Sequence, residues 1–209
     1  MTVKNSYFIS LEGIEGVGKS TQMQFLKQTL DQAHIPYIHT REPGCTVMAE
    51  ELRTVLLKPR TEIVQPVTAA LLLFAARVQH IHNTIQPAIR EGKWVLCDRF
   101  VEASYAYQGG GRGLNPAILA FLEQETLKDC QPDFVLLLDA PVEIALQRVS
   151  QRGNSDRFEK EGAAFFERVR QAYLARAEKD AQRYRIVDAS GSLEAVAEQI
   201  KQFLASILP

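Results

Sequence analysis

Short apolar runs alternate with longer amphipathic stretches along the whole chain. Five runs have the length and apolar content of buried strands: residues 7–11, 37–40, 94–97, 134–139 and 185–187. Helical patterns occupy the stretches between and after them: 22–32, 47–57, 67–77, 101–108, 116–128, from Pro141 to near Arg152, 165–181 and 193–207. This alternation predicts an α/β fold in one domain spanning residues 1–209, with a five-stranded parallel sheet and helices on both faces.

The first predicted strand leads directly into a glycine-rich loop. Residues 13–20 match the pattern G-x-x-x-x-G-K-[ST], with a strand before it and a helical pattern after it. Such a loop points backbone N–H groups at one place and forms a cradle for phosphates. Lys19 can reach the β- and γ-phosphates, and the Ser20 hydroxyl can ligate Mg²⁺. The predicted nucleotide-binding residues are Gly13, Ile14, Glu15, Gly16, Val17, Gly18, Lys19, Ser20 and Thr21. The alternative is a glycine-rich turn followed by Lys-Ser by chance, and both flanks argue against it.

Charged residues also stand where the other predicted strands end. They are Arg41, Glu42, Asp98, Arg99, Asp139 and Asp188. The carboxyl ends of parallel strands meet at one edge of the sheet, where open α/β sheets bind ligands, so we expect these side chains to surround a ligand. A surface salt bridge at a turn is the alternative interpretation of the Arg41–Glu42 pair.

The helical stretch at 67–77 ends in an arginine after an almost entirely apolar run. Phe74 lies one helical turn before Arg77 and on the same face. Together they can sandwich and hydrogen-bond a planar base, or Phe74 can be core with Arg77 at its edge. His80 and His82 follow, and their spacing does not place them on one helix face. We expect both histidines to be exposed and not to bind a metal.

Two polar or glycine-rich segments interrupt the pattern. Residues 151–161 are charged and contain glycine, which predicts a lid that carries Arg152 and Arg157. Residues 109–113, Gly-Gly-Gly-Arg-Gly, are expected to be flexible. The elements on either side are too closely spaced for a domain boundary there.

Composition limits the choice of function. The 209 residues carry a net charge of −1, so the sequence predicts no nucleic-acid polymer and no acidic membrane as partner. The three cysteines are widely spaced, which suits neither a disulfide framework nor a zinc site. We find no export leader and no apolar run near the ~20 residues of a membrane helix, so we expect a cytoplasmic protein.

These residues together indicate phosphoryl transfer. The phosphate loop would hold a nucleoside triphosphate with Mg²⁺, and Arg53, Arg77 and Arg99 would form a second anion site. Transfer needs positioning, charge neutralisation and exclusion of water, and a closing lid with arginines meets these needs. We therefore predict a small phosphotransferase with a small anionic acceptor, most simply a nucleotide.

At this point the chain resembles the bacterial thymidylate kinases, a group of phosphate-loop nucleoside monophosphate kinases. The similarity rests on six ordered stretches: 12–21, 40–44, 74–79, 98–100, 106–113 and 152–159. The resemblance implies the phosphate-loop kinase fold with a small lid, and transfer of the γ-phosphoryl group of ATP to dTMP with Mg²⁺. The product is dTDP, a precursor of dTTP. It also implies a homodimer.

The resemblance further assigns the acceptor site. Phe74 would stack on thymine, and Arg77 would bond a base carbonyl. Ser104 and Gln108 would recognise the base edge, and Tyr107 would crowd the sugar 2′ position. The implied substrate-binding residues are Glu42, Arg53, Phe74, Arg77, Arg99, Ser104, Tyr107 and Gln108.

The implied chemistry involves a smaller group of residues. Arg53 and Arg99 would hold the acceptor phosphate. Glu15 would contact the sugar 3′-hydroxyl region or the zone between phosphate and Mg²⁺. Asp98 would join Ser20 in placing Mg²⁺. The implied catalytic residues are Lys19, Arg99, Arg152 and Glu15.

Two positions depart from patterns found in the family. Some members carry a catalytic arginine in the phosphate loop where this chain has Gly16, so the chain resembles the group whose lid supplies that charge. Cys45 stands where Arg-Glu-Pro-Gly is usually followed by a second glycine.

Two other functions remain as alternatives. One is a nucleoside monophosphate kinase with another base preference. The other is a regulatory GTPase, for which we find no Asn-Lys-x-Asp motif, although residues 188–191 fit D-x-x-G at an unsuitable place.

Overall fold

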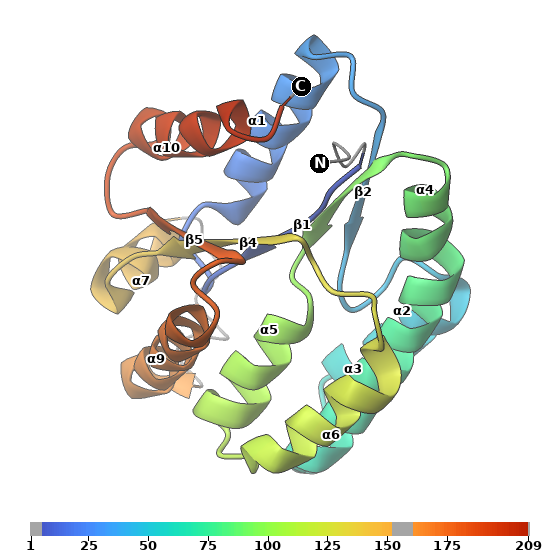
Figure 1. Ribbon diagram of the computed structural model, residues 1–209. Helices are drawn as coiled ribbons and strands as arrows, with labels where there is room; N and C mark the ends of the chain where they lie inside the picture. The colour runs from blue at the N-terminus through green and yellow to red at the C-terminus, as the bar shows by residue number, and fades with distance from the viewer. Residues whose placement is uncertain (1–5, 152–160, 209) are drawn as a thin grey trace.

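A five-stranded, all-parallel sheet forms the centre of the protein (Figure 1), with strand order β2-β3-β1-β4-β5. The computed structural model describes residues 6–151 and 161–208. The strands are β1 Phe8–Glu12, β2 Tyr37–Arg41, β3 Trp94–Asp98, β4 Phe134–Asp139 and β5 Tyr184–Asp188. The predicted sheet is confirmed, and each observed strand end lies within one residue of its predicted position. Leu11 pairs with Asp98 on one side and with Leu136 on the other, so the strand ends lie at one level.

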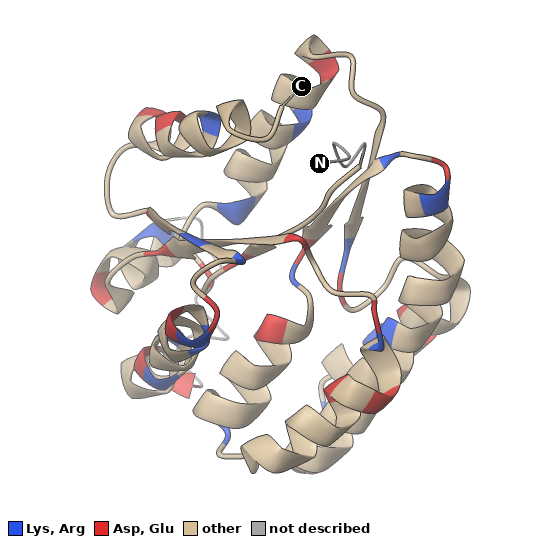
Figure 2. Ribbon diagram, viewed as in Figure 1, with Lys and Arg blue, Asp and Glu red and all other residues tan. Residues whose placement is uncertain are grey.

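Helices cover both faces of the sheet, as predicted. Figure 1 shows α1 and α10 together on one side, and α3, α5, α6 and α9 on the other. The helical elements are α1 Lys19–Gln32, α2 Val47–Leu57, α3 Pro66–His80, η1 Ile81–Ile85, α4 Gln86–Arg90, α5 Val101–Ser104, η2 Tyr105–Gly111, α6 Pro116–Leu127, α7 Val142–Ser150, α9 Ala163–Lys179 and α10 Leu193–Ala205. The elements η1 and α4 were not predicted. Basic and acidic positions are interleaved on helices such as α9 (Figure 2).

The predicted flexible segment at 109–113 is wrong for its first three residues. The chain stays helical through η2 to Gly111. Gly110 and Gly111 pack against α9, where an added Cβ would lie 2.8 Å from the Arg168 carbonyl oxygen or 2.6 Å from the Phe165 ring. These glycines allow two helices to approach closely, and that requirement depends on a segment more than 50 positions away in the chain.

The prediction for His80 is also wrong. α3 continues three residues beyond its predicted end, and the His80 side chain is fully buried. His82, in η1, is exposed as predicted. The reason for the burial of His80 is a carboxylate from the end of β2, described below.

The predicted lid lies mostly outside the described residues. Arg152 and Arg157 belong to residues 152–160, so their roles stay predictions. Within residues 6–151 and 161–208, no helix is both long enough and apolar enough to span a membrane. The thiols of Cys45, Cys97 and Cys130 are free.

Candidate active site

A cavity of about 750 Å³ lies at the carboxyl ends of the central strands. Its walls come from the phosphate loop, the turn after β2, helices α2 and α3, the connection after β3, and η2. All of the predicted substrate-binding residues except Phe74 line it: Glu42, Arg53, Arg77, Arg99, Ser104, Tyr107 and Gln108. Glu15, predicted to be catalytic, and Asp98, predicted to place the metal, line it as well. Apolar side chains that the sequence did not single out, including Leu73 and Val64, complete the walls.

The phosphate loop depends on glycine at its turns. Gly13, Gly16 and Gly18 have φ angles of 132°, 86° and 96°, a region that side chains disfavour. The space is also closed, because a Cβ on Gly13 would lie 2.4 Å from the Leu138 carbonyl oxygen. Pressed against β4 in this way, the loop is held in one curved conformation.

Lys19 curls back over this loop. Its Nζ donates hydrogen bonds to the carbonyl oxygens of Gly13 at 2.9 Å and Ile14 at 2.8 Å. Burial and the nearby positive charge of Arg99 lower the pKa of Lys19 to about 7. The ammonium group therefore stands at the loop but is readily deprotonated near neutral pH.

Ser20 and Asp98 were predicted to place Mg²⁺. Ser20 is exposed at the start of α1, and Asp98 lines the cavity at the end of β3. The buried Oδ1 of Asp98 has no hydrogen-bond partner in the described parts of the chain. No cluster of three or more His, Cys, Asp or Glu residues suited to a metal occurs among the described residues. A hydroxyl and one carboxylate fit Mg²⁺, which keeps several waters and takes its other ligands from phosphates.

Arg99 is held by two tyrosine hydroxyls. Its Nη1 donates to Tyr173 at 3.0 Å and its Nη2 to Tyr107 at 3.1 Å. Each hydroxyl in turn donates to a carboxylate: Tyr107 to Glu15, and Tyr173 to Glu12 at 2.9 Å. Arg99 also forms an ion pair with Glu15 at 3.4 Å. The guanidinium therefore has a fixed orientation at the cavity wall.

Glu12 supports this arrangement from beneath the cavity. It is fully buried and accepts a hydrogen bond of 2.6 Å from the backbone N–H of Phe100. Burial and the neighbouring Glu102 raise the pKa of Glu12 to about 8. The sequence did not single out Glu12 or Tyr173 as supports, because nothing local to either residue indicates the contact between them.

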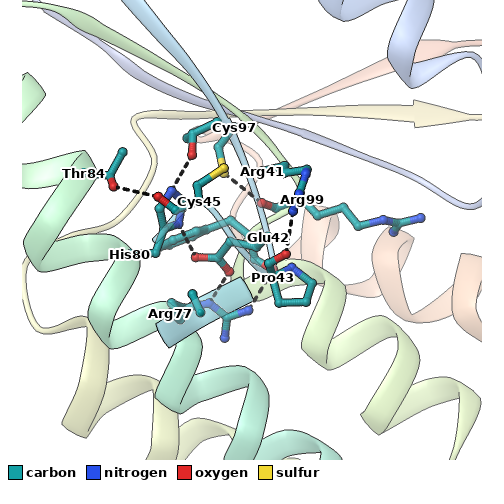
Figure 3. A network of polar contacts seen from close by, with 12 residues as sticks. Arg41, Glu42, Pro43, Cys45, Arg77, His80, Thr84, Cys97 and Arg99 are labelled. Atoms are coloured by element: carbon teal, nitrogen blue, oxygen red, sulfur yellow. Dashed lines mark hydrogen bonds and ion pairs between the residues drawn. The ribbon is translucent and has the colours of Figure 1, made fainter. Parts of the chain in front are cut away.

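Arg77 is buried at the wall between α3 and α5. Its Nε donates to Glu42 Oε2 at 2.6 Å, and its Nη2 donates to Ser104 Oγ at 3.1 Å and to the Phe100 carbonyl oxygen at 3.2 Å. Its Nη1 is buried without a hydrogen-bond partner among residues 6–151 and 161–208. Figure 3 shows Arg77 and His80 approaching the Glu42 carboxylate from two sides. The two N–H bonds of Nη1 are thus left without an acceptor in the described chain, in a residue that lines the cavity.

Phe74 is less accessible than its predicted role suggests. Its side chain is 1% exposed and belongs to the core, and it does not line the cavity. The Arg77 guanidinium carbon lies 4.6 Å from the centre of the Phe74 ring. Contact between this ring and a base would require the guanidinium or the ring to shift.

In the turn after β2, the neighbouring residues Arg41 and Glu42 bind different partners and not each other. Arg41 forms an ion pair with Glu50 at 2.9 Å, whereas Glu42 bonds Arg77. Arg41 and Arg53 both donate to the Pro43 carbonyl oxygen, at 2.9 and 2.8 Å. The Arg41–Glu42 pair is therefore not a surface salt bridge, and Arg53 stands at the mouth of the cavity.

Cys45 completes this turn with a left-handed backbone, at a φ of 66°. Its N–H donates to Glu50 Oε1 at 2.7 Å. A residue with a Cβ carries strain in this region, and glycine does not.

Two acidic residues that were expected to surround the ligand, Asp139 and Asp188, bind protein groups instead. Asp139 pairs with both Nε and Nη2 of Arg170, at 2.7 and 2.8 Å. Asp188 accepts hydrogen bonds from the N–H and hydroxyl of Ser190. Neither residue lines the cavity, so both are engaged in structural contacts at the strand ends.

Comparison with known proteins gives a consistent match. A sequence model of the family described as "Thymidylate kinase" matches residues 11–200. A protein named thymidylate kinase from Marinomonas sp. is 52% identical over 200 residues, which cover 96% of this chain and 94% of the relative. One from Pseudomonas putida is 51% identical over 201 residues, covering 96% and 97%. One from Alcanivorax borkumensis is 47% identical over 197 residues, covering 94% and 95%.

Proposed function

The chain belongs to the thymidylate kinase family, and from this premise we propose how its residues carry out the reaction. The enzyme phosphorylates dTMP to dTDP. We propose ATP as the phosphoryl donor, bound at the phosphate loop with Mg²⁺, and the cavity as the dTMP site. The observation that supports this most directly is the set of buried polar groups in residues lining the cavity that have no partner in the described chain.

Two of these groups have the donor and acceptor character that the edge of thymine requires. Arg77 Nη1 is a spare donor and Gln108 Oε1 a spare acceptor, each buried without a partner in the described chain. Both residues line the same cavity. Thymine presents a carbonyl acceptor next to a ring N–H donor, whereas cytosine presents an amino donor next to a bare ring nitrogen. The arrangement therefore favours thymine over cytosine, and Ser104, which accepts from Arg77 at 3.1 Å, steadies the donor.

The phosphate group of dTMP would bind Arg53 and Arg99. Arg99 and Arg53 line the cavity between the base side and the phosphate loop, and a guanidinium fits phosphate oxygens in a bidentate manner. Tyr107 would stand beside the sugar, and Glu15 between sugar and loop. Glu42 would act through Arg77, because both of its oxygens are already hydrogen-bonded.

The donor end would neutralise developing charge. Lys19 would bind the β- and γ-phosphates, and Ser20 and Asp98 would hold Mg²⁺. The metal ion bridges phosphate oxygens and offsets their charge. The lid arginines, Arg152 and Arg157, would close over the transferred group and exclude water.

We also propose a homodimer. Large apolar side chains are exposed on α2, α3 and α6, which lie together in Figure 1. Their exposed fractions are Val55 46%, Leu57 54%, Val67 39%, Leu71 53% and Phe121 63%. Such a patch is typical of a protein interface. Light scattering should give twice the chain mass, and Phe121→Glu should give the monomer, while Ile186→Glu on β5 should not.

A coupled assay of ATP consumption across the nucleoside monophosphates tests the acceptor assignment. We expect dTMP to give the highest kcat/KM, and Arg77→Ala to raise the KM for dTMP far more than that for ATP. Faster turnover of dCMP or dGMP would contradict the base assignment. Arg152→Ala should lower kcat more than it raises the KM for dTMP, and a pure KM effect would limit Arg152 to binding.

A further inference from the structure

A buried chain of polar contacts runs from the end of β2 to the cavity wall. Thr40 Oγ1 lies 2.6 Å from His80 Nε2, and His80 Nδ1 lies 3.0 Å from Glu42 Oε1. The other oxygen of Glu42 accepts from Arg77 Nε at 2.6 Å. All four residues are buried, with exposed fractions of 3% for Thr40, 0% for His80, 6% for Glu42 and 2% for Arg77.

The carboxylate defines the direction of the bond between His80 and Glu42, and the form of the ring then defines the bond to Thr40. An ionised carboxylate can only accept, so His80 Nδ1 donates to Glu42. In the neutral imidazole, Nε2 is then an acceptor, and the Thr40 hydroxyl donates to it. His80 is thereby held at both ring nitrogens, and it has no ring position left for a ligand.

His80 and Arg77 act on Glu42 as two arms of one clamp. They lie three residues apart on α3, so they project from the same face of the helix. Each occupies one oxygen of the carboxylate, and Glu42 is further tied to the sheet by its N–H, which donates to the Asp98 carbonyl oxygen at 3.0 Å. With both oxygens engaged, the carboxylate cannot rotate without breaking a buried hydrogen bond.

The orientation of Arg77 depends on that carboxylate. The Nε bond to Glu42 and the Nη2 bonds to Ser104 and Phe100 set the plane of the guanidinium. The unpartnered Nη1 lies in the same plane, since the guanidinium is rigid. A rotation of Glu42 would therefore redirect the N–H group that remains for the base.

We propose that His80 is a positioning residue for base recognition, which orients Arg77 toward the base by fixing Glu42. The inference rests on the proposed role of Arg77 at thymine. His80 contacts neither substrate, and its effect reaches the base only through two hydrogen bonds. Its loss should therefore weaken dTMP binding and base discrimination while ATP binding is unchanged.

Two substitutions of His80 separate positioning from packing. In His80→Gln the amide reaches the Nε2 position beside Thr40 and leaves Glu42 Oε1 without its donor. In His80→Asn the amide nitrogen takes the Nδ1 position and can still donate to Glu42. His82→Gln is the matched control, because His82 is exposed on the following turn.

We expect His80→Gln to lower kcat/KM for dTMP by about 10- to 100-fold, the usual effect of removing one partner from a buried charged group. The loss should fall mainly on KM, the ratio of kcat/KM for dTMP over dCMP should decrease, and the KM for ATP should stay within about 2-fold. His80→Asn should recover most of the activity. In an Arg77→Met background, His80→Gln should add little, because the two residues act as one unit.

Three results would overturn the proposal. If the KM for dTMP is unchanged in His80→Gln but raised in Arg77→Met, His80 has no positioning role and the proposed role of Arg77 stands. The second result has three parts: kcat/KM decreases equally for ATP and dTMP, the ratio of kcat/KM for dTMP over dCMP stays the same, and His80→Asn recovers no activity. It would show that His80 contributes only to packing. Normal dTMP kinetics in Arg77→Met would remove the proposed base contact and this inference with it. If His80→Gln proves unfolded by circular dichroism, Thr40→Val serves in its place, with an expected loss of about 3- to 10-fold in the same parameters.

Discussion

The two ends of the site are built in different ways. At the proposed donor end, one continuous segment of nine residues, 13–21, supplies the backbone groups, the lysine and the hydroxyl. At the proposed acceptor end, side chains from many separate parts of the chain meet in one cavity. The donor end can therefore be recognised from local sequence, whereas the acceptor end exists only after folding.

The supports of the two ends differ as well. The loop is held by close contacts between backbones, so its glycines are the critical positions. The cavity arginines are held by side-chain partners: Arg77 by Glu42, and Arg99 by Tyr107 and Tyr173. A substitution at the acceptor end should consequently act through orientation, and one at the donor end through lost charge or a displaced loop.

The largest effect is expected at the donor end. Lys19→Ala should lower kcat at least about 100-fold, because it removes the cation that we propose binds the β- and γ-phosphates. Steady-state kinetics would measure this, with Lys27→Ala on the same helix as control. Near-normal turnover would show that the loop does not hold the donor as proposed.

A loop arginine should not replace the lid arginine. A Cβ on Gly16 would lie 2.2 Å from the carbonyl oxygen of Ala145 in α7, so the loop must move to accept a side chain. Gly16→Arg should raise the KM for ATP about 10-fold or more and should not restore the activity of Arg152→Ala.

Gly92 provides a control at a glycine outside the phosphate loop. Gly92 also has a positive φ, of 73°, but an added Cβ there meets nothing within 4 Å. Gly92→Ala should leave the KM for ATP unchanged. If turnover recovers in the double variant Gly16→Arg/Arg152→Ala, the loop can accept a side chain at position 16. Packing of Gly16 against α7 would then not be the reason why the charge comes from the lid.

A smaller effect is expected when one support is removed at the acceptor end. Tyr107→Phe deletes the hydroxyl between Arg99 and Glu15, and kcat/KM for dTMP should decrease about 3- to 10-fold. The control is Tyr105→Phe, whose hydroxyl donates to Glu123 instead. If the two variants behave alike, the orientation of Arg99 does not depend on Tyr107.

The smallest effect is expected in the number of protons taken up on nucleotide binding, with no change in the reaction rate. In the free enzyme the pKa of Lys19 is lowered to about 7, so its neutral form is favoured at pH 8 and its charged form at pH 6. Phosphates favour the charged form, so nucleotide binding should take up more protons at pH 8 than at pH 6. Calorimetry of MgADP binding in buffers of different ionisation enthalpy measures this uptake. It should vanish in Lys19→Met, and persistence there would assign the proton to another group.

The sheet and the loop illustrate what local sequence can predict. β4 has the predicted bounds because an apolar run between turns specifies a buried strand without reference to the rest of the chain. The phosphate loop follows the same rule, since its glycines and its flanking elements are neighbours in sequence. The family resemblance added the residues of the acceptor cavity, most of which do line it.

The sequence by itself therefore determined the alternation of strands and helices along the chain, the phosphate loop and the class of reaction. Tertiary structure alone decided that His80 is buried against Glu42, that the glycines before Arg112 continue a helix beside α9, and that Phe74 lies beneath Arg77. The physical reason is distance along the chain. Backbone conformation and amphipathic pattern depend on near neighbours, whereas the position of a buried polar side chain depends on the partner that satisfies its hydrogen bonds. That partner can stand dozens of residues away, as Glu42 does from His80.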